Sequence, residues 1–392
     1  MTAAQETTPE RTPGRVLVTD GEFKHTLGIV RALASRGHEV HVLARSKRAP
    51  AVHSRAVRDW RCMPADPAAY APTLLEAASR LAPVSVVLVG SDAMRAGDQL
   101  RAAWPQGVRV AMPPAEAYAI AMAKDRTAEL ARTVGVDTPR TRLVGSPAEL
   151  AAAWREIGPP LVLKSAREEG VKALRYVRTE AELAPAFEQV RADATAGIMA
   201  QEYVSGDGWG FSALYWNGGR VRSFMHHRVR EWPPSGGTSA CAESVPDAPT
   251  LAQAGAALLD ALRWHGVAMV EFKGALAPGA LALIEINAKF WGSHDVALAA
   301  GVDFPGDLVA LLEGRALAPQ APPKAVRFAW PFGGDLWHGL FRPASLPAVL
   351  RDALSPAVAH NWRLDDLSPL FFEIAQWARS APGAWREQRV TR

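Results

Sequence analysis

The chain has 392 residues, of which 48% are hydrophobic and 21% are charged. This length predicts two or three domains with sizeable cores, and the composition is typical of a soluble globular protein. The 44 basic and 40 acidic residues leave a net charge of +4, which is too small to indicate nucleic-acid binding. No apolar run approaches the roughly 18 residues of a membrane span. We therefore expect neither nucleic acid nor a membrane as a partner.

The N-terminal segment and the two cysteines indicate the cellular compartment. Residues 1–13 are polar and lack the apolar centre of a secretory signal, so we expect a disordered tail there. Cys62 and Cys241 are the two cysteines, and their separation excludes a disulfide framework and a zinc-ligand spacing. Both observations favour a cytoplasmic protein.

The first hundred residues alternate between strand and helix patterns. Strands are expected over 15–20, 38–44 and 84–92, and helices over 25–37 and 71–82. Such alternation predicts a small parallel sheet. The unit resembles a nucleotide-binding domain, but no G-x-G-x-x-G fingerprint follows its first strand, which argues against a nicotinamide site.

The next region begins at a proline pair, Pro113 and Pro114, which is typical of a boundary. We expect one helix to carry Lys124 and a second helix to follow it. Residues 147–205 read as helix, two strands, helix and strand. Residues 209–230 read as two strands joined at "NGG", which predicts a hairpin.

A polar constellation lies on the last two predicted strands. In "IEINAK", Glu285, Asn287 and Lys289 alternate with apolar residues and so share one face of a strand. The strand "GVAMVEFKG" before it carries Glu271, and the short link between them predicts an antiparallel hairpin. Two carboxylates and an amide oxygen are hard ligands that suit Mg²⁺. The alternative is a solvated face with a cross-strand pair between a glutamate and a lysine.

Other candidate binding residues stand at strand ends. Lys164 closes the apolar strand "PLVLK", and Glu202 and Tyr203 end another strand before a glycine-rich turn. A strand-to-loop crossing of this kind can present backbone groups to an adenine edge, with Asp207 near the ribose. An exposed strand end and an ordinary turn are the alternatives.

Two arginines, Arg228 and Arg230, alternate on the strand before "PPSGG". A guanidinium binds a carboxylate or phosphate through two parallel hydrogen bonds, so these residues could clamp a substrate. The loop at 235–238 could add an anion-binding nest of backbone N–H groups. Arginines on a solvent-exposed strand are the alternative.

Taken together and in this order, these segments resemble the ATP-grasp superfamily over roughly residues 14–315. The similarity is greatest to the branch with biotin carboxylase and carbamoyl-phosphate synthetase, and to stand-alone carboxylate–amine ligases. The residues that carry it are "KDRT" (124–127), "LVLKSA" (161–166), "QEYVSGDGWGFSALY" (201–215), "HHRVREWPPSGG" (226–237), "WHGVAMVEFK" (264–273) and "LIEINAKFWGS" (283–293).

The resemblance implies an α/β fold with α+β character in the ATP-grasp part. It implies four regions: the tail at 1–13, a pre-ATP-grasp α/β domain at 14–113 with a parallel sheet, an ATP-grasp domain at 114–318 whose lid subdomain spans about 142–205, and a largely helical C-terminal extension at 319–392.

The resemblance also implies roles for the candidate residues. Lys124 and Lys164 would contact the phosphates of ATP, and Glu202 and Val204 would frame the adenine beside Tyr203. The expected metal ligands, for Mg²⁺ or Mn²⁺, are Glu271, Glu285 and Asn287, and the expected catalytic residues are Arg228, Arg230 and Lys289.

Two departures from the family pattern stand out. The loop after "LVLK" reads "SAREEGVKAL" and has one glycine where the family has several. A loop with Glu168 and Glu169 is a poor anion cradle, and Lys172 could compensate. Lys289 stands where the family usually has arginine, so it keeps the charge but loses the planar fork.

The expected function is an ATP- and Mg²⁺-dependent ligase that joins a small-molecule carboxylate to an amine through an acylphosphate. Amino acids or small peptides are the expected substrates, and a homodimer is a candidate assembly. Two alternatives stay open: a bicarbonate-using carboxylase or carbamoyl-type enzyme, and a catalytically inactive nucleotide-binding protein.

Overall fold

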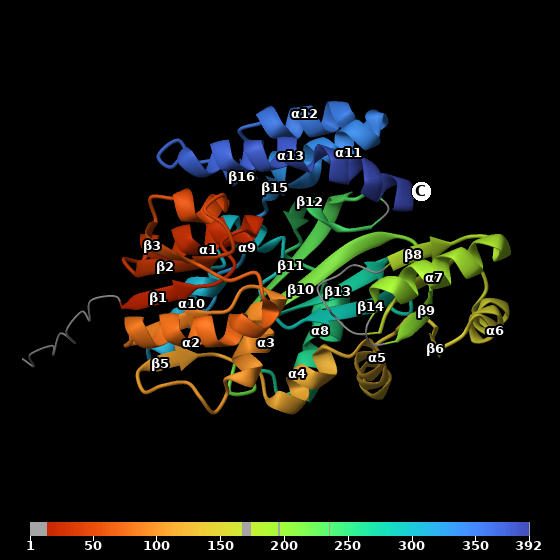
Figure 1. Ribbon diagram of the computed structural model, residues 1–392, viewed down its shortest axis with the longest axis horizontal. Coiled ribbons are helices and arrows are strands. Elements are labelled where there is room, and N and C mark those ends of the chain that lie inside the picture. Colours follow the sequence, from red (N-terminus) through yellow and green to blue (C-terminus); the bar gives the residue numbers. More distant parts are fainter. Residues whose placement is uncertain (1–13, 167–173, 195–196, 235, 392) are drawn as a thin grey trace, which may run out of the picture.

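Three β-sheets organise the part of the chain described by the computed structural model, which comprises residues 14–166, 174–194, 197–234 and 236–391 (Figure 1). The parallel sheet of the N-terminal domain lies at one end of the molecule and the sheet of the lid subdomain at the other. A long antiparallel sheet lies between them, and the last helices of the chain lie along one side. The tail expected at residues 1–13 lies outside the described residues.

The N-terminal sheet is parallel throughout, with the order β3-β2-β1-β4-β5. Its elements are β1 Arg15–Val18, α1 Lys24–Ser35, β2 Glu39–Ala44, η1 Pro50–His53, β3 Val57–Cys62, η2 Pro67–Ala69, α2 Tyr70–Leu81, β4 Val84–Val87, α3 Ser91–Gln99 and β5 Val108–Val110. The predicted parallel sheet is confirmed. Two strands were missed: β3 exposes most of its polar residues, and β5 is only three residues long.

Two helices lead from this domain to the lid: α4 Ala115–Ala121 and α5 Lys124–Thr133. The sequence predicted Lys124 inside the first of two helices, and the structure instead starts the second helix at Lys124. The backbone N–H of Lys124 donates to the carbonyl of Ala166 at 3.2 Å, which joins the start of α5 to the end of a lid strand.

The lid is an antiparallel sheet, β6-β9-β7-β8, with two helices. Its elements are β6 Thr141–Val144, α6 Pro147–Ile157, β7 Leu161–Ser165, β8 Leu174–Val177, η3 Glu180–Glu182, α7 Leu183–Asp193 and β9 Ile198–Glu202. Its buried residues form a hydrophobic cluster of their own.

The central sheet has the order β14-β13-β10-β11-β12-β15-β16 and is antiparallel except for its last pair. Its elements are β10 Asp207–Trp216, β11 Gly219–Trp232, β12 Thr238–Ser244, α8 Pro249–Ala261, β13 Gly266–Gly274, β14 Leu281–Asn287, α9 His294–Ala299 and α10 Phe304–Leu312. The hairpin predicted at "NGG" is present. Asn217 and Gly218 both have positive φ angles, 51° and 82°, as a type I′ turn requires.

The C-terminal segment completes this sheet and then covers it. It contains β15 Arg327–Ala329, η4 Pro331–Asp335, α11 Leu336–Phe341, η5 Pro343–Ser345, α12 Leu346–Leu354, β16 Val358–His360 and α13 Ser368–Thr391. Because β15 pairs with β12, the sheet continues beyond residue 318. The domain boundary expected at that residue stays a prediction.

The N-terminal domain and the central sheet share their hydrophobic cores. Leu17 and Val86 of the parallel sheet belong to the same buried cluster as Phe211 and Val270 of the central sheet. The two sheets therefore form one packed body, to which the lid is attached with its separate core.

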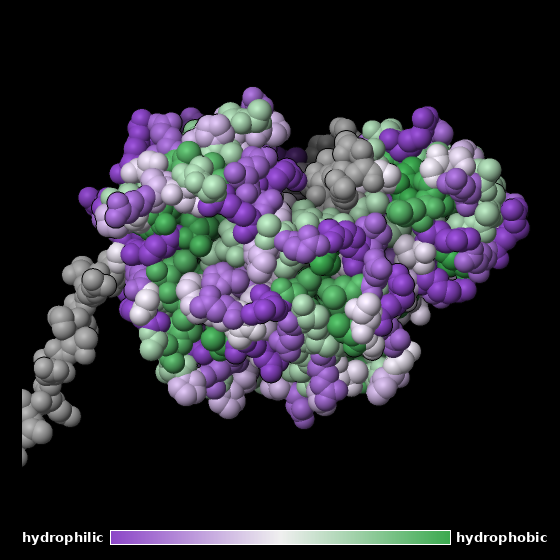
Figure 2. Space-filling view, turned by 90° about the horizontal axis from the view of Figure 1, so that it is seen from below, coloured by the Kyte–Doolittle hydropathy of each residue, from purple (hydrophilic) through white to green (hydrophobic). Residues whose placement is uncertain are grey.

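The helices of the described residues include none that is long and apolar enough to cross a membrane. On the face shown in Figure 2, apolar side chains lie in patches that are bordered by polar ones. Such a mixture is normal for a surface in water, where apolar atoms contribute more than half of the accessible area.

Candidate functional site

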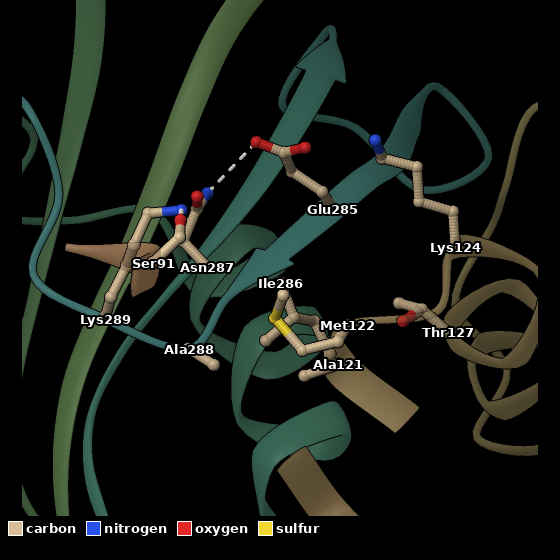
Figure 3. Close-up of a pocket in the computed structure, with 10 residues that line it drawn as sticks. All are labelled: Ser91, Ala121, Met122, Lys124, Thr127, Glu285, Ile286, Asn287, Ala288 and Lys289. Atoms are coloured by element: carbon tan, nitrogen blue, oxygen red, sulfur yellow. Dashed lines mark hydrogen bonds between the residues drawn. The ribbon is translucent and has the colours of Figure 1, made fainter. Parts of the chain in front are cut away.

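The predicted carboxylates meet on β13 and β14. These strands are antiparallel neighbours, and their register places Glu271 directly opposite Glu285. The side-chain amide of Asn287 donates to Oε1 of Glu285 at 3.2 Å (Figure 3). The hairpin thus brings together the three residues that were predicted as metal ligands.

Glu285 and Asn287 line a pocket together with side chains from α5, from α3 and from the loop after β14. Lys124 and Thr127 enter from α5, and Ser91 enters from the first turn of α3. Lys289 follows β14 and donates from Nζ to the hydroxyl of Ser91 at 2.7 Å. In Figure 3 the side chain of Lys124 extends to the same side of the pocket as the Glu285 carboxylate.

Glu271 is bound by Arg228 through both carboxylate oxygens, at 2.7 and 2.5 Å. The same guanidinium donates to Glu231 at 3.1 Å and to the carbonyl of Gly237 at 3.2 Å. Burial raises the pKa of Glu271, and the nearby Glu285 carboxylate raises it further, while Arg228 opposes both effects. Two adjacent carboxylates of this kind are stabilised by a cation.

These residues fit a magnesium ion in chemical type. Among the described residues no three His, Cys, Asp or Glu side chains gather as metal ligands. The candidate set is instead two carboxylates and one amide oxygen, which are donors that Mg²⁺ accepts alongside water and phosphate oxygens. A carboxylate held by a guanidinium retains further lone pairs, so Glu271 can serve both Arg228 and a cation.

The two predicted arginines point to different partners. Arg228 pairs in the sheet with Ala242, and Arg230 pairs with the adjacent Cys241, so β11 contains a bulge between them. A bulge changes the direction of a side chain. Arg230 is buried and binds Asp335 and Asp352 of the C-terminal segment at 2.7 to 2.8 Å. The structure does not bring Arg230 to Glu271 and Glu285.

The glycines of "DGWGF" create the space in which Arg228 reaches β13. A Cβ at Gly208 of β10 would lie 2.9 Å from Cδ of Arg228. A Cβ at Gly210 would lie 2.1 Å from Cε1 of His226. Both distances are below normal contact, so the two side chains of β11 pack directly over the glycine backbone of β10.

The predicted phosphate contacts lie near the end of β7. Lys164 is buried on β7, and the hydrogen bond from Lys124 to Ala166 brings the start of α5 to this end of the strand. Lys172, which was expected to compensate for the glycine-poor loop, lies outside the described residues.

The predicted adenine residues lie at the end of β9. The Glu202 carboxylate is bound by Arg140, whose guanidinium lowers the pKa of Glu202. The ring of Tyr203 makes an edge contact with Tyr176, with ring centres 5.8 Å apart.

Val204 and Asp207 are the other two residues predicted near the adenine and the ribose, and both are accessible to solvent. Val204 is partly exposed beyond the end of β9. Asp207 begins β10, and its carboxylate lies 3.8 Å from Nε2 of His227. Arg140 binds the side chain of Glu202. Any contact of an adenine with the edge after β9 would therefore be made by backbone groups.

The sequence did not single out Ser91, Thr127 or Glu231. Ser91 follows the apolar strand "VSVVLVG", and the end of a parallel strand is a common position for site residues, so a signal was present. Glu231 could be recognised only once the bulge of β11 was known.

No protein-family model matches the chain. A D-alanine–D-alanine ligase of Acidovorax ebreus is 32% identical over 101 residues, which are 26% of this chain and 30% of the ligase. The match thus spans less than a third of that relative's length.

The structural similarity extends further. Biotin carboxylase of Campylobacter jejuni, in a complex with an ATP compound, has a TM-score of 0.65 and 16% identity, covering 80% of this chain and 74% of the carboxylase. The ADP complex of an N5-carboxyaminoimidazole ribonucleotide synthetase has a TM-score of 0.64 and 15% identity, covering 96% and 98%. Both have the ATP-grasp fold. This chain therefore has the ATP-grasp fold, and the fold predicted from its motifs is confirmed.

Proposed function

We propose that the protein is an ATP- and Mg²⁺-dependent ligase that joins a carboxylate to an amine through an acylphosphate and releases ADP and phosphate. The observation that carries this proposal is the pairing of Glu271 with Glu285 across two strands, where Glu285 lines one pocket together with Asn287 and Lys124. Catalysis of phosphoryl transfer is chiefly positioning and charge stabilisation, and these residues supply both.

The residues have separate roles in this proposal. Glu285, Asn287 and Glu271 would hold magnesium, which neutralises charge on the phosphate oxygens when bound. Lys124 and Lys164 would bind phosphate oxygens near the end of β7. Lys289, fixed by Ser91, and Arg228 would orient the carboxylate that is to be phosphorylated. The edge after β9 would receive the adenine.

The relatives support an amide-forming reaction on small substrates, since a D-alanine–D-alanine ligase joins two amino acids. The structural neighbours favour a second candidate. A biotin carboxylase and a carboxyaminoimidazole synthetase resemble the chain over most of its length, and a bicarbonate substrate would use the same phosphoryl transfer.

The products identify the reaction. ADP and phosphate are to be measured with ATP and Mg²⁺ across single amino acids and amino-acid pairs, with and without bicarbonate. Release that needs an amino acid supports the ligase, and release that needs bicarbonate supports the carboxylase. AMP and pyrophosphate would contradict the acylphosphate route. If the protein binds ATP but releases neither ADP nor AMP, it is an inactive nucleotide-binding protein.

The metal site has its own test. We expect Glu285→Gln to lower turnover by at least about 100-fold, because a neutral amide is a weaker magnesium ligand than a carboxylate. The matched control is Glu129→Gln on the exposed side of α5. Thermal unfolding should show that both variants remain folded. Full activity of Glu285→Gln would remove this residue from the metal site.

A further inference from the structure

Lys24 enters the central part of the molecule from the N-terminal domain. It is the first residue of α1, and its ammonium donates to the carbonyl of Ser239 at the start of β12. The ammonium also lies over the ring of Trp330, 4.2 Å from the ring centre. Three parts of the fold therefore meet at one side chain: the start of α1, the central sheet and the C-terminal segment.

Two glycines lie against the Lys24 side chain. A Cβ at Gly292 would lie 3.7 Å from Cε, and a Cβ at Gly333 would lie 3.1 Å from Cδ. Gly292 is three residues beyond Lys289 in the loop between β14 and α9, so Lys24 lies beside the loop that carries Lys289. Larger residues at these two positions would press on Cδ and Cε of Lys24.

The ammonium has unused hydrogen-bonding capacity within the described residues. An ammonium has three donors, and one of them is used by the Ser239 carbonyl. No salt bridge joins Lys24 to a carboxylate in the described part of the chain. Asp295 attracts it electrostatically, but one oxygen of Asp295 accepts from the indole of Trp330 at 2.8 Å, and the other faces Gly28 of α1.

The other cation near Lys24 is already compensated. Arg228 repels Lys24 and is itself neutralised by Glu271 and Glu231. Burial lowers the pKa of Lys24 to about 8, although Asp295, Asp335 and Glu373 attract the ammonium electrostatically. A partly buried ammonium that uses one of its three donors gains hydrogen bonds when an anion binds to it.

We infer that Lys24 binds an anionic group of the substrate, a carboxylate or a phosphate, at a point separate from the carboxylate that reacts. This inference rests on the proposed function and narrows it, because the substrate would be an acidic compound with at least two anionic groups. It also gives the segment "TDGEFKHT" of the N-terminal domain a part in substrate selection.

The alternative is that Lys24 only ties α1 to β12. A purely structural contact between α1 and β12 affects stability, but it does not make the affinity for an anionic ligand differ from that for a neutral ligand of the same shape. The discriminating quantity is therefore the ratio of affinities for glutarate and for its neutral diamide, glutaramide. Methyl phosphate serves as the phosphate probe.

The experiment is calorimetric titration of the full chain with these three probes, with ATP affinity measured in parallel. We expect glutarate or methyl phosphate to bind in preference to glutaramide. Lys24→Met should lower the affinity for the bound anion about 10- to 100-fold, as expected for a lost charge-assisted hydrogen bond. Lys24→Arg should retain most of the affinity, and Lys47→Met on the exposed surface should change nothing.

The outcomes separate the inference from the proposed function. If ATP binds but neither anion binds, or if Lys24→Met leaves the ratio of glutarate to glutaramide unchanged, the inference is wrong and the ligase proposal stands. If ATP does not bind to the wild-type protein, the ligase proposal fails, while a Lys24-dependent preference for an anion would still support the anion site. Preference for glutarate or for methyl phosphate identifies the anion.

Discussion

At the scale of single residues, Arg228 is the cation that compensates the carboxylates of the candidate site. Its side chain is 7% exposed and contacts Glu271 and Glu231, which are 18% and 20% exposed. A buried cation between two carboxylates compensates both, and its removal leaves like charges facing each other in a region of low dielectric.

We therefore expect Arg228→Met to lower the free energy of unfolding by about 3–5 kcal/mol, the usual cost of removing one partner of a buried ion pair. Urea unfolding followed by circular dichroism measures this change. The double variant Arg228→Met/Glu271→Gln should recover part of the loss, because one unpaired charge is then absent. If the single and double variants are equally stable, the loss of stability in Arg228→Met does not come from an unpaired Glu271 carboxylate.

The carboxylate set could be predicted from the sequence because it depends on short-range rules. The two-residue period of a strand places Glu285 and Asn287 on one face, and a short link makes the hairpin that adds Glu271. The same rule placed Arg228 and Arg230 on one face. The bulge of β11 breaks that rule, and nothing in the local sequence reveals where a strand gains an extra residue.

At the scale of elements, β10 acts as a spacer between β11 and β13. The glycine-rich turn that the sequence predicts after Tyr203 meets the strand that it predicts from residue 209, and both Gly208 and Gly210 lie within β10. Glycine in a strand often marks a close approach of other groups. Here the close groups are the side chains of Arg228 and His226.

We expect Gly210→Ala to destabilise the protein by about 1–3 kcal/mol, because the new methyl group would overlap the buried ring of His226 and force it to move. The control is Gly219→Ala at the start of β11, where a Cβ would meet only a backbone oxygen at 3.5 Å. Its effect should stay within about 0.5 kcal/mol. Thermal and urea unfolding give both values, and equal values for the two variants would contradict the spacer role.

The order of elements was predictable from the sequence over much of the chain, whereas the C-terminal segment was not. Strand and helix periods identify β1, β2, β4 and the hairpin of β10 with β11. The strands β15 and β16 have three residues each, which is too short for a two-residue period to be visible. Their role as the end of the central sheet depends on long-range pairing.

At the scale of the whole molecule, the C-terminal segment connects the N-terminal domain with the central sheet (Figure 1). One anchor is Asp366, which is bound by Arg31 at 2.8 Å and by the hydroxyl of Ser54 at 2.5 Å. The other anchor is the pair Asp335 and Asp352, bound by Arg230 of β11. The segment also supplies Trp330, on which Lys24 lies.

The two anchors predict a cooperative unit. Arg230→Met leaves the buried Asp335 without its guanidinium partner and leaves Asp352 with only the more distant Arg327, at 3.9 Å. We therefore expect it to cost about 3–5 kcal/mol and to speed amide hydrogen exchange throughout residues 327–380. Arg220→Met on the exposed start of β11 is the control and should leave exchange unchanged.

If the segment opens as one unit, adding Asp366→Asn to Arg230→Met will cost less than Asp366→Asn does in the wild-type protein, because the segment is already open. Strictly additive costs, with faster exchange confined to the neighbourhood of each substitution, would show that the two anchors act independently.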